Sequence, residues 1–295
     1  MRLSIKCFLS VLLVTISAFS FTGCARKGPC LQCSGGQDPG LNEKSENWKN
    51  LNIKAVQLYQ KGQLNEATSS SAEALNYSKK NFGPENDKVA TSLNNLAELY
   101  RIQKKYPEAE SNYNKSLAMR KKVLGDDHPD VSLSLNNLAT LYVAQKKYNQ
   151  AEKMYNESLT ILEKKLGKEN IGLHTSLGNL ADLYKIEGKY LNAEVVLKRL
   201  LSIYQKANKK DELGYPKALN DLATVYYFEG KYTESEPLFK QTLSILEKKL
   251  GKNNPQLLVV LENIAEVYKK IGNTTQADIF TERAKGIRTV NHITG

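Results

Sequence analysis

Apolar and small residues recur along this chain with the period of a helix and, on a longer scale, every 42 residues. Leu93, Leu96, Ala97 and Tyr100 are spaced i, i+3, i+4 and i+7, which places them on one face of an α-helix. The last two come back at the longer interval, as Ala97, Ala139, Ala181, Ala223 and Ala265 and as Tyr100, Tyr142, Tyr184, Tyr226 and Tyr268. A fixed period of this length predicts a repeat architecture.

A second helical pattern follows the first within each unit. It runs from Tyr106 through Ala109 and Tyr113 to about Leu124, and Gly125 is expected to end it with a left-handed backbone. The next segment, 126–130, supplies helix N-cap candidates and a proline suited to a first helical turn. Each unit is therefore predicted to be a hairpin of two helices, here called helix A and helix B, with no strands.

Six such units fit the chain, because the first helix pattern is centred near residues 55, 97, 139, 181, 223 and 265. One small residue recurs early in every helix B: Ala67, Ala109, Ala151, Ala193, Ser235 and Ala277. Only a small side chain there would let the paired helices approach closely, so we interpret this column as a packing feature. The tyrosine columns are likewise predicted to belong to the core.

These motifs resemble tetratricopeptide (TPR) repeats of the kinesin-light-chain type. The resemblance rests on Asn94-Leu96-Ala97-Tyr100, on 106–110 (Tyr-Pro-Glu-Ala-Glu) and on 124–131 (Leu-Gly-Asp-Asp-His-Pro-Asp-Val), and it covers about 250 residues. The units exceed the usual TPR length of about 34 residues, as they do in that subtype. The resemblance implies an all-α, right-handed α-solenoid of about six hairpins, whose A helices line a concave surface that binds peptides.

Polar residues, asparagine above all, recur on the face of helix A opposite the core. The predicted peptide-binding residues are Asn52, Asn94, Asn95, Glu98, Arg101, Asn136, Asn137, Asn179, Asp182, Lys185, Asn220, Tyr227 and Asn263. Asparagine disfavours helix interiors, so its recurrence needs a reason. Either these amides grip a peptide backbone from solvent-facing positions, as the resemblance implies, or they bond to neighbouring helices and hold the stack together.

The N-terminus carries the features of an export signal. Arg2 and Lys6 precede an uncharged run over 7–21, which is too short for a permanent membrane span. The next residues, Phe-Thr-Gly-Cys at 21–24, resemble the lipobox of bacterial lipoproteins, although that motif usually has Leu where this chain has Phe21. The resemblance implies a signal peptide over 1–23 and lipid attachment at Cys24. Ordinary cleavage near Ser20 is the alternative.

Residues 24–46 are predicted to form a flexible tether before a solenoid over 47–295, because they are rich in Gly, Pro, Ser and polar residues. In this tether Cys30 and Cys33 form a C-x-x-C pair. A local disulfide is the favoured interpretation, since an even pair of thiols remains once Cys24 is lipidated. A redox site or metal capture are the alternatives. Ala25 follows the lipidated cysteine, and in Gram-negative lipoproteins a non-acidic residue there implies the outer membrane.

The formal net charge of +11 would ordinarily suggest nucleic acid, but export argues against that partner. Much of the excess belongs to a lysine column at the ends of the B helices: Lys80, Lys122, Lys164, Lys206 and Lys248. A cation there complements the helix dipole, and attraction to an anionic membrane is the alternative.

Catalysis has no support in the sequence: the chain has three histidines and no H-E-x-x-H, G-x-S-x-G or P-loop motif. We expect no enzyme activity, no cofactor and no metal. The leading hypothesis is a membrane-tethered adaptor that binds a protein or peptide in the TPR groove, in the cell envelope. The alternative is a structural scaffold of an envelope or secretion complex that uses the convex face and the edges.

Overall fold

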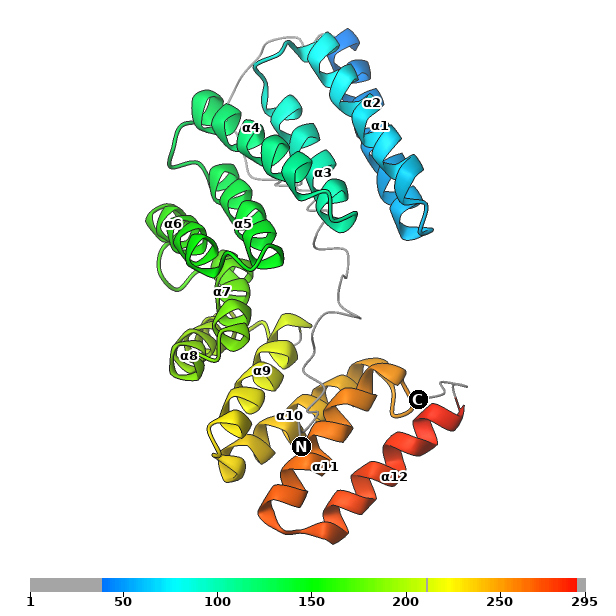
Figure 1. The fold of residues 1–295 in the computed structure, drawn as a ribbon, viewed down its shortest axis with the longest axis vertical. Coiled ribbons are helices and arrows are strands. Elements are labelled where there is room, and N and C mark those ends of the chain that lie inside the picture. Colours follow the sequence, from blue (N-terminus) through cyan, green and yellow to red (C-terminus); the bar gives the residue numbers. More distant parts are fainter. Residues whose placement is uncertain (1–38, 211, 291–295) are drawn as a thin grey trace. The chain divides into compact units, whose positions relative to one another are not determined.

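The computed structural model describes residues 39–210 and 212–290, which fold into helices with no strand among them (Figure 1). The A helices are α1 (Pro39–Gln60), α3 (Asp87–Ile102), α5 (Pro129–Ala144), α7 (His174–Ile186), α9 (Gly214–Phe228) and α11 (Leu258–Ile271). The B helices are α2 (Leu64–Phe82), α4 (Tyr106–Leu124), α6 (Tyr148–Leu166), α8 (Tyr190–Lys206), α10 (Tyr232–Leu250) and α12 (Thr274–Val290). Short 3-10 turns, η1 (Ile171–Leu173) and η2 (Pro255–Leu257), precede α7 and α11. The prediction of six helical hairpins in an all-α solenoid is confirmed.

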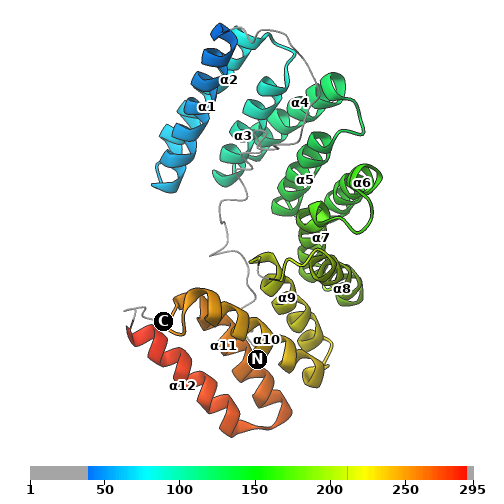
Figure 2. The same cartoon turned by 180° about the vertical axis from the view of Figure 1, so that it is seen from behind.

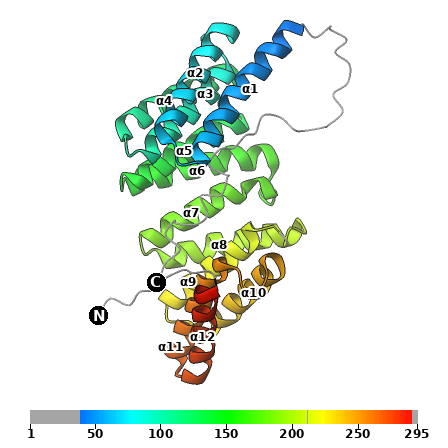
Figure 3. The same ribbon diagram turned by 90° about the vertical axis from the view of Figure 1, so that its right-hand side faces the viewer.

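Two compact units divide the described chain within α6, one ending at Ile161 and the other beginning at Leu162. In the N-terminal unit, α2 packs on α3 and α4 packs on α5, so each hairpin contacts the next (Figure 2). In the C-terminal unit, α8 packs on α9 and α10 packs on α11 (Figure 3). Each unit is therefore a run of hairpins joined by neighbour contacts, as expected for a solenoid.

The boundary of the predicted tether needs correction, because α1 begins at Pro39 and so includes residues 39–46. Proline is well suited to the start of a helix, since its φ is already helical and its missing N–H would have no partner there. Residues 41–44 are exposed in this first stretch, which explains why the apolar pattern gave no sign of it. Cys24, Cys30 and Cys33 lie outside the described residues, so the lipid and disulfide predictions stay predictions.

The turns between helices repeat as regularly as the helices do. Gly125, at the end of α4, has φ 87° and ψ 158°, so its φ is positive as expected but its ψ is extended instead of left-handed. This backbone region is nearly exclusive to glycine. A positive φ also recurs in the turn from helix A to helix B, at Gly62, Lys104, Lys146, Gly188, Gly230 and Gly272. The same backbone reversal thus closes every hairpin.

The small-residue column is buried as the sequence predicted. Ala67, Ala109, Ala151, Ala193 and Ser235 are 0% exposed, and Ala277 is 1% exposed. Ser235 is tolerated because its hydroxyl donates to the carbonyl of Ala223 on the paired helix α9, at 2.7 Å. The first tyrosine column packs at the core margin, and three of its hydroxyls donate to a glutamate of the preceding hairpin, as Tyr268 does to Glu236 at 2.7 Å. These three tyrosines, Tyr142, Tyr226 and Tyr268, therefore link each hairpin to the one before it by a hydrogen bond.

Replacing Ala151 by Leu is expected to destabilise the protein by roughly 1 to 3 kcal/mol, because the added atoms have no space between α5 and α6. Asn156→Leu, at an exposed position of the same helix α6, is the matched control and should change stability little. The measurement is thermal unfolding followed by circular dichroism. Equal melting temperatures for the wild type and Ala151→Leu would refute the close helix contact described here.

Candidate peptide-binding face

The asparagines of the A helices form a ladder of side-chain hydrogen bonds between neighbouring hairpins. Asn95 of α3 donates from Nδ2 to Oδ1 of Asn52 in α1 at 2.8 Å, and Asn137 of α5 donates to Asn94 of α3 in the same way, also at 2.8 Å. Asn52 in turn donates to the carbonyl of Trp48. The asparagine pairs therefore link consecutive A helices, which is the second of the two roles that the sequence left open.

The two members of each pair differ in exposure. Asn52 and Asn94 are only 3% and 7% exposed, whereas Asn95 and Asn137 are half-buried at the surface. Within the described part of the chain, Asn95 and Asn137 each use one amide N–H in the ladder. Their amide oxygens and remaining N–H groups are left for solvent or a ligand. The ladder thus fixes the orientation of two amides that can still accept and donate.

Other members of the predicted set are buried and do not face solvent as the first interpretation expected. Asn136, Asn220 and Asn263 are 5%, 7% and 3% exposed. Asn136 donates to the carbonyl of Ser132 and to the hydroxyl of Ser158 on α6. Asn220 has a buried amide oxygen without a hydrogen-bond partner among the described protein atoms, while Asn179 is half-buried. A role for any of these residues in peptide binding stays a prediction.

Glu98 and Arg101 of α3 are brought together and pair with a third, buried residue. Arg101 donates from Nε and Nη2 to the two carboxylate oxygens of Glu98, at 2.8 and 2.6 Å. Tyr113 of α4, which is 0% exposed, donates its hydroxyl to the same carboxylate at 2.6 Å. Burial, followed by the charge of Glu98, raises the pKa of Tyr113 well above its ordinary value, so this hydroxyl remains a donor.

A ring of four charges replaces the ladder between α7 and α9. By the spacing of the ladder, Asp221 would pair with residue 178. That residue is Gly178, which has no side-chain amide. Instead, Lys185 lies 2.7 Å from Asp182 and 2.5 Å from Asp221, and Lys217 lies 3.0 Å from Asp182 and 2.7 Å from Asp221. Each lysine therefore bridges both aspartates, and the ring holds the two A helices together by charge.

The ring keeps Asp221 ionised although its side chain is only 6% exposed. Burial alone would raise the pKa of Asp221, but the ammonium groups of Lys217 and Lys185 outweigh it and hold this pKa below its ordinary value. Burial would likewise lower the pKa of Lys185, and the charges of Asp221 and Asp182 reverse that effect. Tyr227, nearly two turns after Asp221 in α9, is not part of the ring and packs edge-on against Phe228 and Tyr232.

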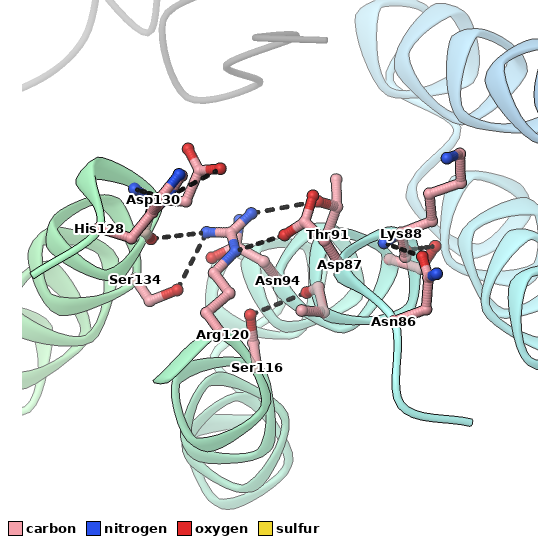
Figure 4. Close-up of polar contacts among 12 residues, drawn as sticks. Asn86, Asp87, Lys88, Thr91, Asn94, Ser116, Arg120, His128, Asp130 and Ser134 are labelled. Carbon is pink, nitrogen blue, oxygen red and sulfur yellow. Dashed lines mark hydrogen bonds and ion pairs between the residues drawn. The ribbon is translucent and has the colours of Figure 1, made fainter. Parts of the chain in front are cut away.

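Arg120 of α4 is a buried residue of this region that the sequence interpretation missed. Figure 4 shows its guanidinium between α3 and α5, where it donates to the hydroxyls of Thr91 and Ser134 and to the carbonyl of Asp130. It also forms an ion pair with Asp87 at 3.4 Å. The sequence signal was an arginine in a column that holds Ser78, Leu162, Tyr204 and Leu246 in four other units and a second arginine, Arg288, in the last. Arg120 joins three helices and fixes Thr91 on the A-helix face.

Two lysines of the column at the ends of the B helices, Lys122 and Lys206, form ion pairs with acids. Lys122 lies 2.5 Å from Glu85, and Lys206 forms the corresponding ion pair with Glu169. In both cases the acid belongs to the connection that precedes the hairpin carrying the lysine. Part of the basic excess is therefore neutralised locally.

The described residues contain neither a candidate metal site nor a candidate membrane-spanning helix. No group of three or more His, Cys, Asp or Glu side chains there could hold a metal ion. No helix among residues 39–290 is long and apolar enough to span a bilayer.

The repeats now identify the class of protein. The tetratricopeptide repeat model matches residues 47–122, 90–164, 131–206, 172–248 and 214–289, so the chain belongs to the tetratricopeptide repeat family. Proteins of this family generally serve protein–protein interaction or scaffolding.

Solved structures share the fold at low sequence identity. BtubC (BKLC) from P. vanneervenii is 21% identical, with 88% of this chain and 94% of that chain covered and a TM-score of 0.65. The TPR-like repeats of a Podosopora anserina protein described as a kinesin light chain are 23% identical, with 71% of this chain and 100% of that chain covered and a TM-score of 0.63. The structure of pilF from Pseudomonas aeruginosa is 17% identical, with 83% of this chain and 93% of that chain covered and a TM-score of 0.57. No curated protein matches the chain.

Asp221→Asn is expected to destabilise the protein by about 2 to 4 kcal/mol near neutral pH, because it removes the buried carboxylate of the ring and leaves the half-buried Lys185 with one aspartate instead of two. The pKa of Asp221 is lowered in the folded state, so its contribution is complete above the unfolded value of about 3.9 and is lost as pH falls through the folded value. The difference between wild type and variant should therefore shrink in acid.

Urea unfolding at about pH 7 and about pH 3 measures this difference. Asp182→Asn, at a side chain that is 40% exposed, should cost less and serves as the control. A difference between Asp221→Asn and wild type that is equally large at both pH values would contradict the ring.

Proposed function

We propose that this protein is a membrane-tethered adaptor that binds a protein or peptide segment along the exposed face of its A helices. The observation that carries the proposal is the asparagine ladder. It holds the amides of Asn95 and Asn137 in fixed, half-exposed positions on neighbouring helices, each with an acceptor and a donor to spare. An extended peptide carries one N–H and one C=O at every residue and is matched to such amides.

The ladder divides the work between its two columns. Asn52 and Asn94 are buried, so they act as positioning residues, and Asn95 and Asn137 act as the contacts. Fixing these side chains before binding lowers the entropy lost on association. Backbone recognition of this kind tolerates many peptide sequences. The neighbouring Glu98–Arg101 ion pair would add a contact for a charged side chain of the peptide.

The tether is the second part of the proposal. Its support is the sequence alone: the short apolar run over 7–21 and the lipobox-like residues ending at Cys24. Lipid attached at Cys24 would hold the solenoid at a membrane of the cell envelope, with the outer membrane favoured by Ala25. The same export route makes nucleic acid an unsuitable partner, and we propose no enzyme activity.

Asn95→Ala and Asn137→Ala should each weaken partner binding by about 1 kcal/mol, the value of one neutral hydrogen bond. Each should also lower stability by about 1 to 3 kcal/mol, because it strands the buried Oδ1 of Asn52 or Asn94. Asn94→Ala should lower stability by about 1 kcal/mol, since it removes one hydrogen bond from the half-exposed Asn137, and it should weaken binding less than Asn137→Ala does. The measurement pairs circular dichroism with affinity capture from envelope extracts. Asn114→Ala, an exposed asparagine of α4, is the control. Unchanged capture by the Asn95→Ala/Asn137→Ala double variant would favour the scaffold alternative.

Cys24→Ser is expected to abolish incorporation of labelled palmitate and to release the protein from membranes washed with salt. Cys33→Ser should leave both properties unchanged, since Cys33 is not the predicted lipid site. The measurement is metabolic labelling followed by membrane fractionation. Label that persists in Cys24→Ser would refute the lipoprotein assignment.

A further inference from the structure

The outer surface of α8 exposes two aliphatic side chains where a soluble helix normally presents polar ones. Leu191 and Val195 are each 69% exposed, more than any other large hydrophobic side chain among the described residues. They are four residues apart and so lie on the same face of the helix. Lys198, at 57% exposed, continues this face.

The repeat provides its own comparison. The positions equivalent to Leu191 are Asn65, Pro107, Asn149, Thr233 and Thr275, and those equivalent to Val195 are Ser69, Ser111, Lys153, Pro237 and Ile279. No other hairpin is aliphatic at both positions. The pair is therefore a feature of this one hairpin and not of the repeat, which argues against a general packing role.

Aromatic side chains extend the apolar surface towards α9. Tyr190 stacks on Phe228, with 5.2 Å between ring centroids and 4° between ring planes. Phe228 is 41% exposed, and Tyr190 is next to Leu191 in the chain. The apolar surface therefore continues from α8 onto the end of α9.

The charges at this surface are layered, with the cations outermost. Lys198 and Lys231 both reach Glu194, at 2.6 and 3.3 Å, and Lys231 also lies 2.8 Å from Glu229. The lysine side chains are 57% and 40% exposed, but Glu194 and Glu229 are only 14% and 10% exposed. An approaching surface thus meets ammonium groups before it meets the carboxylates.

We propose that this surface of α8 and α9, defined by Tyr190, Leu191, Val195, Lys198, Phe228 and Lys231, rests on an anionic lipid bilayer. Aliphatic and aromatic side chains with flanking lysines are the composition of interfacial membrane contacts. Leu191 and Val195 protrude from the surface of α8 instead of lining a groove. Protruding apolar side chains are suited to insertion among lipid headgroups, whereas a partner segment would be expected to bind in a groove.

The contact is separate from the proposed lipid at Cys24 and from the A-helix face. A lipobox cysteine carries two acyl chains, which already anchor a protein stably. The contact on α8 and α9 would add to this anchor by fixing how the C-terminal unit lies on the membrane.

Local insertion can be read with an environment-sensitive fluorophore on the full chain. Cys7, Cys24, Cys30 and Cys33 are replaced by Ser, and a nitrobenzoxadiazole label is placed on Val195→Cys. Ile279→Cys is the matched control: it has the same place in the repeat and is 53% exposed, but its neighbours Asp278 and Glu282 are exposed acids. Lys153→Cys is the polar control.

Vesicles of phosphatidylcholine mixed with phosphatidylglycerol should increase the emission at position 195 severalfold and shift it to the blue, with no change at 279 or 153. Pure phosphatidylcholine should give a weaker response. Adding Leu191→Ser to the Val195→Cys chain should raise the lipid concentration for half-maximal response about tenfold or more, since each buried methylene changes partitioning about fourfold.

Two results would overturn the proposal. The same response at positions 195 and 279 would mean that the α8 surface is not special. No response at 195 with either vesicle would exclude the bilayer and assign the surface to a protein partner. Because Cys24 is absent throughout, neither result depends on whether the chain is lipidated.

Discussion

The close contact between the two helices of each hairpin, at one small residue, is the constraint on which the rest of the structure depends. Alanine or serine fills this position in all six hairpins, and none is more than 1% exposed. With the helices held this near, leucines such as Leu138 and Leu180 are enclosed between them. Within each of the two units, helix B of one hairpin packs on helix A of the next, as expected for a solenoid. The regular spacing of the A helices within a unit follows from these contacts.

Regular spacing in turn makes polar contacts between A helices possible. Two amides at 2.8 Å can join consecutive helices only if the helix separation is reproduced from one hairpin to the next. Where Gly178 interrupts the ladder, the two lysines and two aspartates of the charged ring join α7 and α9 instead. Amide contacts are insensitive to pH and salt, whereas a charged joint responds to both. The two units therefore combine one architecture with different electrostatics.

Binding and membrane contact would use different hairpins of the chain. The A helices carry the oriented amides of Asn95 and Asn137, and the B helix α8 carries the exposed Leu191 and Val195. The two proposed contacts therefore share no residue.

The sequence by itself determined the fold: its period, the hairpin unit, the small-residue column and the end glycines are local signals repeated every 42 residues. It also located the polar face of the A helices. It did not show which member of each asparagine pair is exposed, because the exposure of two adjacent helix positions depends on how the next hairpin covers them. It missed the start of α1 at Pro39, since residues 41–44 are exposed and show no helical pattern of apolar residues. Arg120 and the charged ring join residues far apart in the chain, up to 39 positions between Asp182 and Asp221. Only the packing of one hairpin on another brought those groups within hydrogen-bond distance, and so only the tertiary structure decided which charges are buried in pairs.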